Sequence, residues 1–515
     1  MNSGLISIPE QFRLTARAHA DRDLVVTQQQ NHSFSEIDAA SDRIAAALAR
    51  QGIGKSDRIA LYCINCAEFL MAWHGIVKSG ATVVPVNLLI AADEICYILG
   101  DAEVSGIIYH QAMAEKVSTF RDRLNGISLW AAIGEPQSES DQTLSTWLAE
   151  SSVTPAVSFD PLDDVAVILY TSGTTGNPKG AMLSHHNLVS YTSSVCAGLQ
   201  LKPGEDRLLV VLPMFHSFAA TVGMLTPSLH GLSLVPVPAF DPILISETIA
   251  ATDATIFLGV PSMYGVILRL PEEQTANWSS IRYGVSGGAA MPVELMHQFE
   301  ARFGFPILEG DGPTECSPVT CVNPLDGERK PGSVGLPIPG VEMAIFDPRG
   351  GVLANNEIGE VCVRGDNVMK GYWKLPHDTA ESFYGEWVRT GDLGYRDEDG
   401  YFFLIDRIKD MIIVNGMNVY PRMIEEVLYK HPDLAEAAVV GEPHATHGEI
   451  VVAHVVAKDG CSTASSVIRA FCREHLGQHQ VPRKVIIRDS LPKNATGKIL
   501  KRELRKTGEV ERGIK

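Results

Sequence analysis

The chain has 515 residues, which is too long for one hydrophobic core and predicts two or three domains. Hydrophobic residues make up 45% and charged residues 20%, as in an ordinary soluble globular protein. The formal net charge of −18 argues against non-specific binding of nucleic acid.

No secretion signal is expected, because the first residues, Met1 to Leu5, lack a basic start and an apolar core. The nine cysteines are scattered, and Cys63-x-x-Cys66 has no second pair that could complete a metal site. We expect reduced thiols and a cytoplasmic protein. Residues 208–240 lack Asp, Glu, Lys and Arg, but prolines and histidines interrupt them. They predict buried strands and a pocket-lining helix, with at most peripheral membrane contact.

Helices and strands alternate from the start of the chain. Residues 35–50, which begin at Ser35-Glu36, have apolar positions at helical spacing after a serine that can cap. The elements expected next are a strand at 58–62, a helix around 68–73, a strand at 81–86, a helix at 91–99 and a strand at 106–109. This order predicts an α/β fold of layered, mostly parallel sheets, and the alternation over residues 165–310 predicts a second layer.

The pattern changes between residues 340 and 405 to short strands and tight turns, which predicts a small β unit. Strands and helices alternate again beyond residue 407, where 18 basic and 13 acidic residues give +5 and leave −23 for the rest. We therefore expect a large domain at 1–406 and a small α+β domain at 407–515. The basic domain could dock an anionic cosubstrate or simply complement the acidic one.

The most informative segment is 170–180, which follows the apolar run 165–169 and combines three glycines, three threonines, a serine and Lys179. Glycines let main-chain N–H groups curl around an anion, hydroxyls add donors, and the lysine adds a mobile positive charge. The spacing differs from the common nucleotide-triphosphatase loop, since Pro178 precedes the lysine and a glycine follows it. The segment still predicts a loop that binds the phosphates of a nucleotide triphosphate.

Four further segments carry chemistry. Residues 307–315 form a strand that enters a glycine turn with a hydroxyl and a carboxylate, and residues 387–392 end a strand with a carboxylate suited to ribose hydroxyls. Residues 406–416 place charged side chains at the expected domain junction, and residues 491–500 put a lysine after a glycine turn. In this order and spacing, with the phosphate loop, they closely resemble the adenylate-forming superfamily of acyl-CoA synthetases, adenylation domains and luciferases, over about residues 10–505.

The resemblance implies a two-step reaction with ATP, Mg²⁺ and coenzyme A. A carboxylate attacks the α-phosphorus of ATP and releases pyrophosphate, and a thiol then displaces AMP. Because two anions must meet, the site needs cations and hydrogen-bond donors at the transferred group. By analogy the β- and γ-phosphates would be held by Thr171, Ser172, Gly173, Thr174, Thr175, Gly176 and Lys179.

The same resemblance implies the remaining roles. Glu315 would hold Mg²⁺ with Thr171 nearby, Thr314 would touch the α-phosphate, and Lys498 would bridge the carboxylate and the α-phosphate. Asp392 and Arg407 would bind the ribose. The strip along the adenine would consist of Gly287, Gly288 and Ala289, with Asp311 and Gly312 also in the nucleotide site. His216 is grouped with the catalytic residues.

By the same resemblance, Lys409 matches the hinge position of the family. The small domain would swing about this hinge, so that its face with Gly416 replaces Lys498 and the thiol can enter. One position departs from the family pattern: Asp311 stands where an aromatic residue, mostly tyrosine, usually stacks beneath adenine. Asp311 could accept from the adenine amino group or cap the turn.

The segment 213–218 matches the start of the family's acyl pocket, and no acid follows it that could pair with an amino-acid ammonium group. Small apolar residues favour an alkyl chain: Ala219, Ala220, Val222, Gly223, Met224, Val260–Met263 and Val285. The sequence favours an AMP-forming fatty acid–CoA ligase. Alternatives are a ligase for aryl or short branched acids, one that delivers to a carrier protein, and a noncatalytic nucleotide sensor. The oligomeric state is left open.

Overall fold

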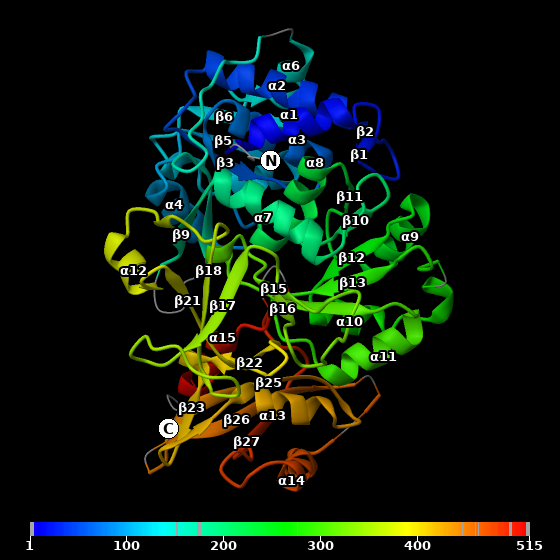
Figure 1. The fold of residues 1–515 in the computed structure, drawn as a ribbon, viewed down its shortest axis with the longest axis vertical. Helices are drawn as coiled ribbons and strands as arrows, with labels where there is room; N and C mark the ends of the chain where they lie inside the picture. The colour runs from blue at the N-terminus through cyan, green and yellow to red at the C-terminus, as the bar shows by residue number, and fades with distance from the viewer. Residues whose placement is uncertain are drawn as a thin grey trace.

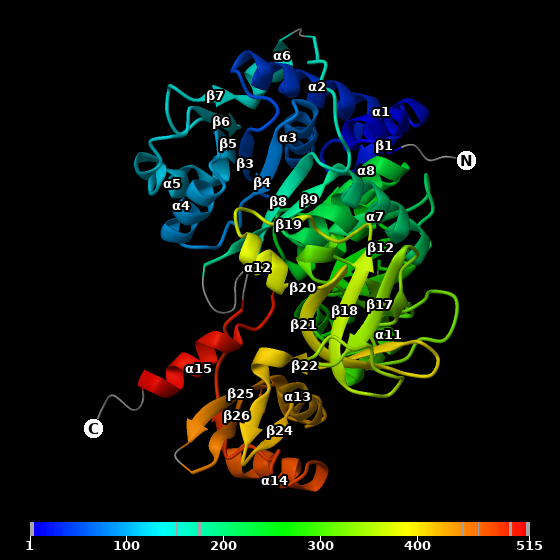
Figure 2. The same ribbon diagram turned by 60° about the vertical axis from the view of Figure 1, so that its left-hand side comes forward.

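The computed structural model describes residues 5–150, 153–171, 177–275, 277–444, 446–458, 460–461, 463–493 and 497–510, with side chains up to Arg505. Figures 1 and 2 show two bodies: a large one, and a small one below it that is formed by the C-terminal part of the chain. The last strand of the large body ends at Arg407, and the first strand of the small body begins at Ile412.

The first sheet of the large body has eight strands in the order β19-β9-β8-β4-β3-β5-β6-β7. Its strands from β8 to β7 are parallel, β9 pairs antiparallel with β8, and β19 pairs antiparallel with β9. The strands are β3 (Arg58–Tyr62), β4 (Thr82–Pro85), β5 (Gly106–His110), β6 (Leu129–Ile133), β7 (Gln142–Thr143), β8 (Val165–Thr171), β9 (Lys179–Ser184) and β19 (Gly371–Tyr372).

The second sheet has nine strands in the order β16-β15-β14-β13-β12-β10-β11-β1-β2, with a parallel centre from β14 to β1. They are β1 (Asp23–Val25), β2 (His32–Ser33), β10 (Arg207–Val210), β11 (Ser233–Pro236), β12 (Ile256–Gly259), β13 (Tyr283–Ser286), β14 (Ile307–Asp311), β15 (Cys321–Val322) and β16 (Leu336–Pro337). Because parallel strands are covered on both faces, their residues are almost all buried.

Helices connect and cover these two sheets (Figure 1). They are α1 (Ile8–Ala18), α2 (Phe34–Arg50), α3 (Ala67–Lys78), α4 (Ala92–Asp101), α5 (Ala114–Ser118), α6 (Leu144–Ala149), α7 (His185–Gly198), α8 (Thr226–His230), α9 (Pro242–Thr252), α10 (Pro261–Ile267) and α11 (Val293–Phe303). A π-helical segment, Ala219–Leu225, precedes α8. One apolar core extends across both sheets and the helices between them.

The predicted small β unit is an antiparallel sheet in the order β17-β18-β21-β20, with β22 paired to β21. It contains β17 (Val341–Phe346), β18 (Gly359–Gly365), β20 (Phe383–Tyr384), β21 (Trp387–Arg396) and β22 (Phe402–Arg407), and α12 (Pro376–Glu381) lies beside it. The turns predicted at 347–351 and 397–400 lie in its connections.

The small body has its own sheet and its own apolar clusters. Its strands are β23 (Ile412–Val414), β24 (Met417–Val419), β25 (Leu434–His444), β26 (Gly448–Ala457) and β27 (Lys484–Ile487), and its helices are α13 (Pro421–Tyr429), α14 (Ser465–His475) and α15 (Lys501–Val510). The mixed, mostly antiparallel sheet confirms the α+β prediction for this region.

Local sequence accounts for the element boundaries. Helix α2 begins one residue before the expected stretch, where the Ser33 hydroxyl accepts from the Glu36 backbone N–H, and the Glu36 carboxylate accepts from Ser33 N–H at 2.8 Å. The expected second layer at 165–310 is partly wrong, because β8 and β9 join the first sheet through the pairing of β8 with β4. Alternation along the chain does not determine which sheet receives a strand.

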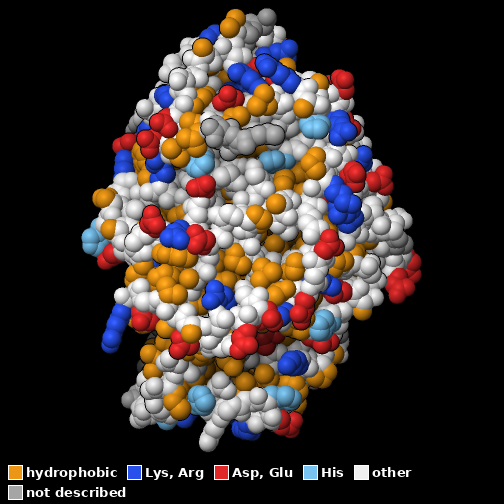
Figure 3. Space-filling model, viewed as in Figure 1, with side chains coloured by type: hydrophobic (Ala, Val, Ile, Leu, Met, Phe, Trp, Pro, Cys, Tyr) orange, Lys and Arg blue, Asp and Glu red, His pale blue; other side chains and the backbone are white. Residues whose placement is uncertain are grey.

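Two further expectations concern the surface and the cysteines. All nine cysteines are free thiols, as predicted, and the Cys63 and Cys66 sulfurs lie 3.6 Å apart. None of the described helices combines the length and apolarity that crossing a membrane requires. On the face in Figure 3, acidic and basic side chains are interspersed among the described residues.

Candidate active site

The two bodies enclose one large cleft of about 1410 Å³. The carboxyl ends of the parallel strands β12, β13 and β14 open into it, which is where ligands bind in open α/β sheets. Most sequence-predicted site residues line it together: Thr171, Lys179, His216, Gly287, Gly288, Asp311, Gly312, Thr314, Glu315, Asp392, Arg407, Lys409 and Lys498.

The phosphate loop joins two antiparallel strands at the edge of the cleft. Thr171 ends β8 and faces Lys179, the first residue of β9. The Lys179 ammonium group pairs with the Asp378 carboxylate of α12, and it lies 5.2 Å from the centre of the Tyr372 ring. The predicted phosphate contacts Ser172, Gly173, Thr174, Thr175 and Gly176 lie outside the described residues.

The turn after β14 presents a hydroxyl and a carboxylate to the cleft. Only glycine fits at position 312, where a Cβ atom would come within 1.5 Å of the Pro318 carbonyl oxygen. The Thr314 hydroxyl lies 3.1 Å from the Ser217 hydroxyl, and Glu315 Oε1 accepts from the Tyr372 hydroxyl at 2.7 Å. Tyr372 lies in a two-residue strand far along the chain, and no motif in the sequence pointed to it.

Asp392 and Arg407 face each other across the adjacent strands β21 and β22. Arg407 Nε lies 2.7 Å from Asp392 Oδ1. Burial raises the pKa of the Asp392 carboxyl, and the guanidinium group opposes this rise. Burial and the nearby Asp392 charge raise the pKa of Asp311, so the departure from the family pattern places a second acid beside Asp392 in the cleft.

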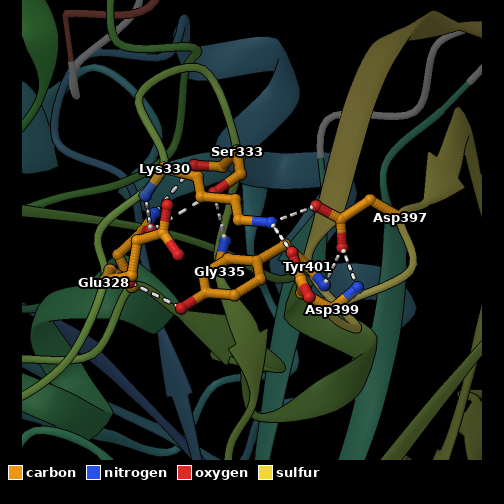
Figure 4. A network of polar contacts seen from close by, with 8 residues as sticks. Glu328, Lys330, Ser333, Gly335, Asp397, Asp399 and Tyr401 are labelled. Carbon is orange, nitrogen blue, oxygen red and sulfur yellow. Dashed lines mark hydrogen bonds and ion pairs between the residues drawn. The ribbon is translucent and has the colours of Figure 1, made fainter.

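A polar network outside the cleft fixes the hairpin that carries this pair (Figure 4). The Lys330 ammonium group lies 2.6 Å from Asp397 and 2.5 Å from Asp399, both in the β21–β22 turn. The Tyr401 hydroxyl donates to the Glu328 carbonyl at 2.5 Å. Because residues 328–330 follow β15 of the nine-stranded sheet, the network ties the two sheets together.

Lys498 comes from the small body and lines the same cleft as the nucleotide residues. Its side chain is exposed, but the protein atoms around it also desolvate the ammonium group. This desolvation, followed by the Arg407 charge, lowers the pKa of Lys498, and the carboxylates of Asp392 and Asp311 oppose the change. Lys409 lies at the junction of the bodies, and desolvation lowers its pKa to about 8.

The apolar wall of the cleft differs in part from the prediction. His216 lies beside it, and burial lowers the pKa of its imidazole to about 4, so the ring is neutral at pH 7. Val260 and Val285 line the cleft as expected, whereas the expected residues from 219 to 224 pack in the core behind it. Further apolar lining residues include Leu199, Leu212, Phe215, Phe218, Val319 and Val322.

Two predicted residues do not line the cleft. Ala289 follows Gly288, which has a φ of +75°, but is not itself a lining residue. Gly416 lies in the exposed turn between β23 and β24 and has a φ of +78°. A Cβ atom at this position would have no other atom within 4 Å, so the turn is open on this side.

Sequence reasoning missed one buried acid where the bodies meet. Glu309, in β14, is buried, and desolvation raises its pKa to about 7. Its Oε1 atom accepts from the Met291 backbone N–H at 2.9 Å and lies 3.9 Å from Arg422 of α13. Its position in the expected strand, directly after Ile307-Leu308 and before the glycine turn, could have identified it.

Comparisons with known proteins agree with this arrangement. The model of the AMP-binding enzyme family matches residues 12–373, and that of the AMP-binding enzyme C-terminal domain matches residues 423–498. A long-chain-fatty-acid–CoA ligase of Bacillus subtilis (strain 168) is 36% identical over 499 residues, which cover 92% of this chain and 89% of the relative.

Two solved structures are also similar. The ATP-bound MatB from Rhodopseudomonas palustris has a TM-score of 0.89 at 32% identity, covering 98% of this chain and 99% of that one. The anthranilate CoA ligase AuaEII in complex with anthranoyl-AMP has a TM-score of 0.92 at 27% identity, covering 99% and 98%. The family resemblance is thus confirmed, and the chain belongs to the AMP-binding enzyme family.

Proposed function

We propose that this protein is an AMP-forming acyl-CoA synthetase that activates a fatty acid with ATP and transfers the acyl group to coenzyme A. The observation that carries the proposal is the position of Lys498, which lies in one cleft with the acids and hydroxyls of the large body. The fatty acid–CoA ligase relative, similar over nearly its full length, supports the same activity.

In the first half-reaction, a fatty acid carboxylate oxygen attacks the α-phosphorus of ATP. The new bond joins the acyl oxygen to phosphorus, the bond to the bridging oxygen of the β-phosphate breaks, and pyrophosphate leaves. Lys498 offsets the repulsion between the two anions, and Thr314 donates to the α-phosphate. Removing such a charge from a site shielded from water costs roughly 10²–10³ in rate.

The nucleotide would be held by groups that the large body already orders. Asp392 accepts hydrogen bonds from the ribose hydroxyls. Arg407, which is held by Asp392, also binds the ribose. Gly287 and Gly288 lie along the adenine, while Thr171 and Lys179 bind the β- and γ-phosphates with the loop between them. Lys179 exchanges its pairing with Asp378 for the phosphates, because a polyphosphate carries more charge than one carboxylate.

The donor set suits Mg²⁺ bound together with ATP. Glu315 and Thr171 line one cleft, and no group of three acidic, histidine or cysteine side chains that could hold a metal exists among the described residues. Mg²⁺ typically takes one or two protein oxygens and completes its shell with phosphates and water. When bound, the ion neutralises phosphate charge.

The acyl group would occupy the apolar part of the cleft. Phe215, Phe218 and Val285 line it, and no acid between residues 208 and 240 could pair with an amino-acid ammonium group. Each buried CH₂ of an alkyl chain contributes about 0.8 kcal/mol. Aryl or short branched acids, and a carrier-protein acceptor, are the alternatives.

The second half-reaction requires the small body to move. The sequence predicted a large domain at 1–406 and a mobile small domain at 407–515. Because β22 ends at Arg407 and pairs with β21, we propose a boundary one residue later, between Arg407 and Ile408, with Lys409 at the hinge. Rotation withdraws Lys498 and brings the Gly416 turn to the cleft, so the coenzyme A thiol attacks the acyl carbon and AMP leaves. The free thiols of the chain favour a cytoplasmic enzyme.

A panel of carboxylic acids tests this proposal. ATP–pyrophosphate exchange is measured with saturated fatty acids of several lengths, benzoate-type acids and short branched acids, followed by thioester formation with and without coenzyme A. We expect exchange that depends on fatty acids and thioester that depends on coenzyme A. Exchange with benzoate-type acids alone would favour the aryl alternative, and exchange without thioester would favour another acceptor.

A further inference from the structure

The small body touches the large body immediately beside Lys498. Ser262 is the second residue of α10, the short helix after β12, and its hydroxyl donates to the Gly497 carbonyl oxygen at 3.2 Å. Gly497 precedes Lys498 in the chain. Ser262 does not line the cleft, whereas Val260 and Lys498 do. The contact therefore lies behind the reactive side chain and not on the substrate side.

The approach at this contact is close enough to exclude a side chain at position 497. Gly497 has a φ of +80°, in the left-handed region that favours glycine. A Cβ atom there would come within 2.6 Å of Ser262 Oγ and 3.2 Å of Val260 Cγ2, while the Ser262 Cβ would be 3.9 Å away. The steric conflict therefore arises mainly from the serine hydroxyl oxygen.

The other end of the interface is held by different residues. Arg422 of α13 donates to the Leu404 carbonyl at 2.7 Å and lies 3.9 Å from Glu309. These contacts dock α13, and the Ser262 contact acts locally on the backbone that carries the lysine.

We propose that Ser262 is a positioning residue for Lys498, which holds the Gly497 carbonyl so that the lysine points into the cleft during adenylation. The inference rests on the proposed function and deepens it. A backbone carbonyl fixed one residue before the lysine restricts the direction of its side chain, and a displacement of about 1 Å in an active site can cost on the order of 10²-fold in rate. The contact separates when Lys498 leaves, so Ser262 has no part in thioester formation.

The first test compares the half-reactions of Ser262→Ala. Loss of one neutral hydrogen bond predicts an adenylation rate about three- to tenfold lower, in kcat and not in the KM for ATP. Thioester formation from supplied acyl-adenylate and coenzyme A stays within twofold of the unmodified enzyme. Ser190→Ala is the matched control, because the Ser190 hydroxyl bonds only along its own helix, to the His186 and Asn187 carbonyls. It should leave both half-reactions unchanged.

The second test uses the steric relation of the two residues. Gly497→Ala should lower adenylation by at least about 50-fold, through the positive φ and the conflict with the Ser262 hydroxyl, with thioester formation retained. Adding Ser262→Ala removes the conflicting oxygen. We expect the double variant to adenylate about tenfold faster than Gly497→Ala alone, although Ser262→Ala slows the unmodified enzyme.

The outcomes separate this inference from the proposed function. An unmodified enzyme without fatty-acid-dependent exchange overturns the proposed function. An active enzyme in which the losses of the two substitutions multiply, or in which Ser262→Ala slows both half-reactions equally, overturns the positioning role of Ser262 alone.

Discussion

The two bodies contribute different kinds of parts to the cleft. The large body supplies groups fixed within it, such as the pair of Asp392 and Arg407 at 2.7 Å and the bond of Tyr372 to Glu315 at 2.7 Å. The small body supplies Lys498, which follows a glycine that touches the wall at Ser262. In the proposed mechanism, the large body therefore binds the nucleotide, and the small body, which moves, carries the positive charge used in the first chemical step. Substitutions at the nucleotide-binding groups of the large body should affect both half-reactions. Those in the small body, or at Ser262 where the large body touches Gly497, should affect only one.

The largest effect is expected for Asp392→Ala in the large body. Both ATP and acyl-adenylate carry the ribose, and the variant also leaves Arg407 without its carboxylate, so we expect kcat/KM to fall about 10²–10³-fold in both half-reactions. Glu398→Ala, in the exposed turn of the same hairpin but outside the cleft and outside the Lys330 network, is the matched control and should stay within twofold. Unimpaired thioester formation from acyl-adenylate in Asp392→Ala would break the comparison.

A smaller and opposite effect is expected at the exposed turn of the small body. Gly416→Leu should slow thioester formation about 30-fold, because a bulky side chain would obstruct the face that meets coenzyme A, and should leave adenylation unchanged. Gly460→Leu is the control, since Gly460 also has a positive φ of +76° and open space around its Cβ position. Equal slowing by both variants would mean that backbone strain, and not the position of Gly416, causes the loss.

The smallest effect concerns stability at the junction. Burial raises the pKa of Glu309 to about 7 from its ordinary value of 4.5, so the folded protein retains a proton that the unfolded chain releases between these values. The free energy of unfolding therefore falls as the pH rises through this window, by on the order of 1–3 kcal/mol. Glu309→Gln lacks this dependence. Chemical unfolding at pH 5 and pH 8 should show that the free energy of unfolding of Glu309→Gln, relative to that of the unmodified protein, is higher at pH 8. The same difference in free energy at both pH values would contradict the raised pKa of Glu309.

The sequence predicted the elements better than their assembly. The strand at 58–62 and the helix at 35–50 follow from hydrophobic spacing and local caps, which depend on neighbouring residues. The membership of β8 in the first sheet depends on its pairing with β4, more than eighty residues earlier. No local pattern specifies such a partner.

The residues of the site likewise fall into two groups: those that the sequence identifies and those that only the fold reveals. Thr314, Glu315 and Asp392 lie in short motifs and could be identified from the sequence. Tyr372, Asp378 and Ser262 act through contacts with residues far along the chain, so only the fold reveals them. The prediction that residues 219–224 line the acyl pocket is wrong because this π-helical segment packs against β10, α7 and α8 in the core.

The most direct measurement is the ratio of the two half-reaction rates in Lys498→Ala. We predict that ATP–pyrophosphate exchange with a fatty acid falls about 10²–10³-fold, while thioester formation from supplied acyl-adenylate and coenzyme A persists. Equal loss in both reactions, or unchanged exchange, would contradict the central claim that the small body delivers Lys498 for adenylation alone.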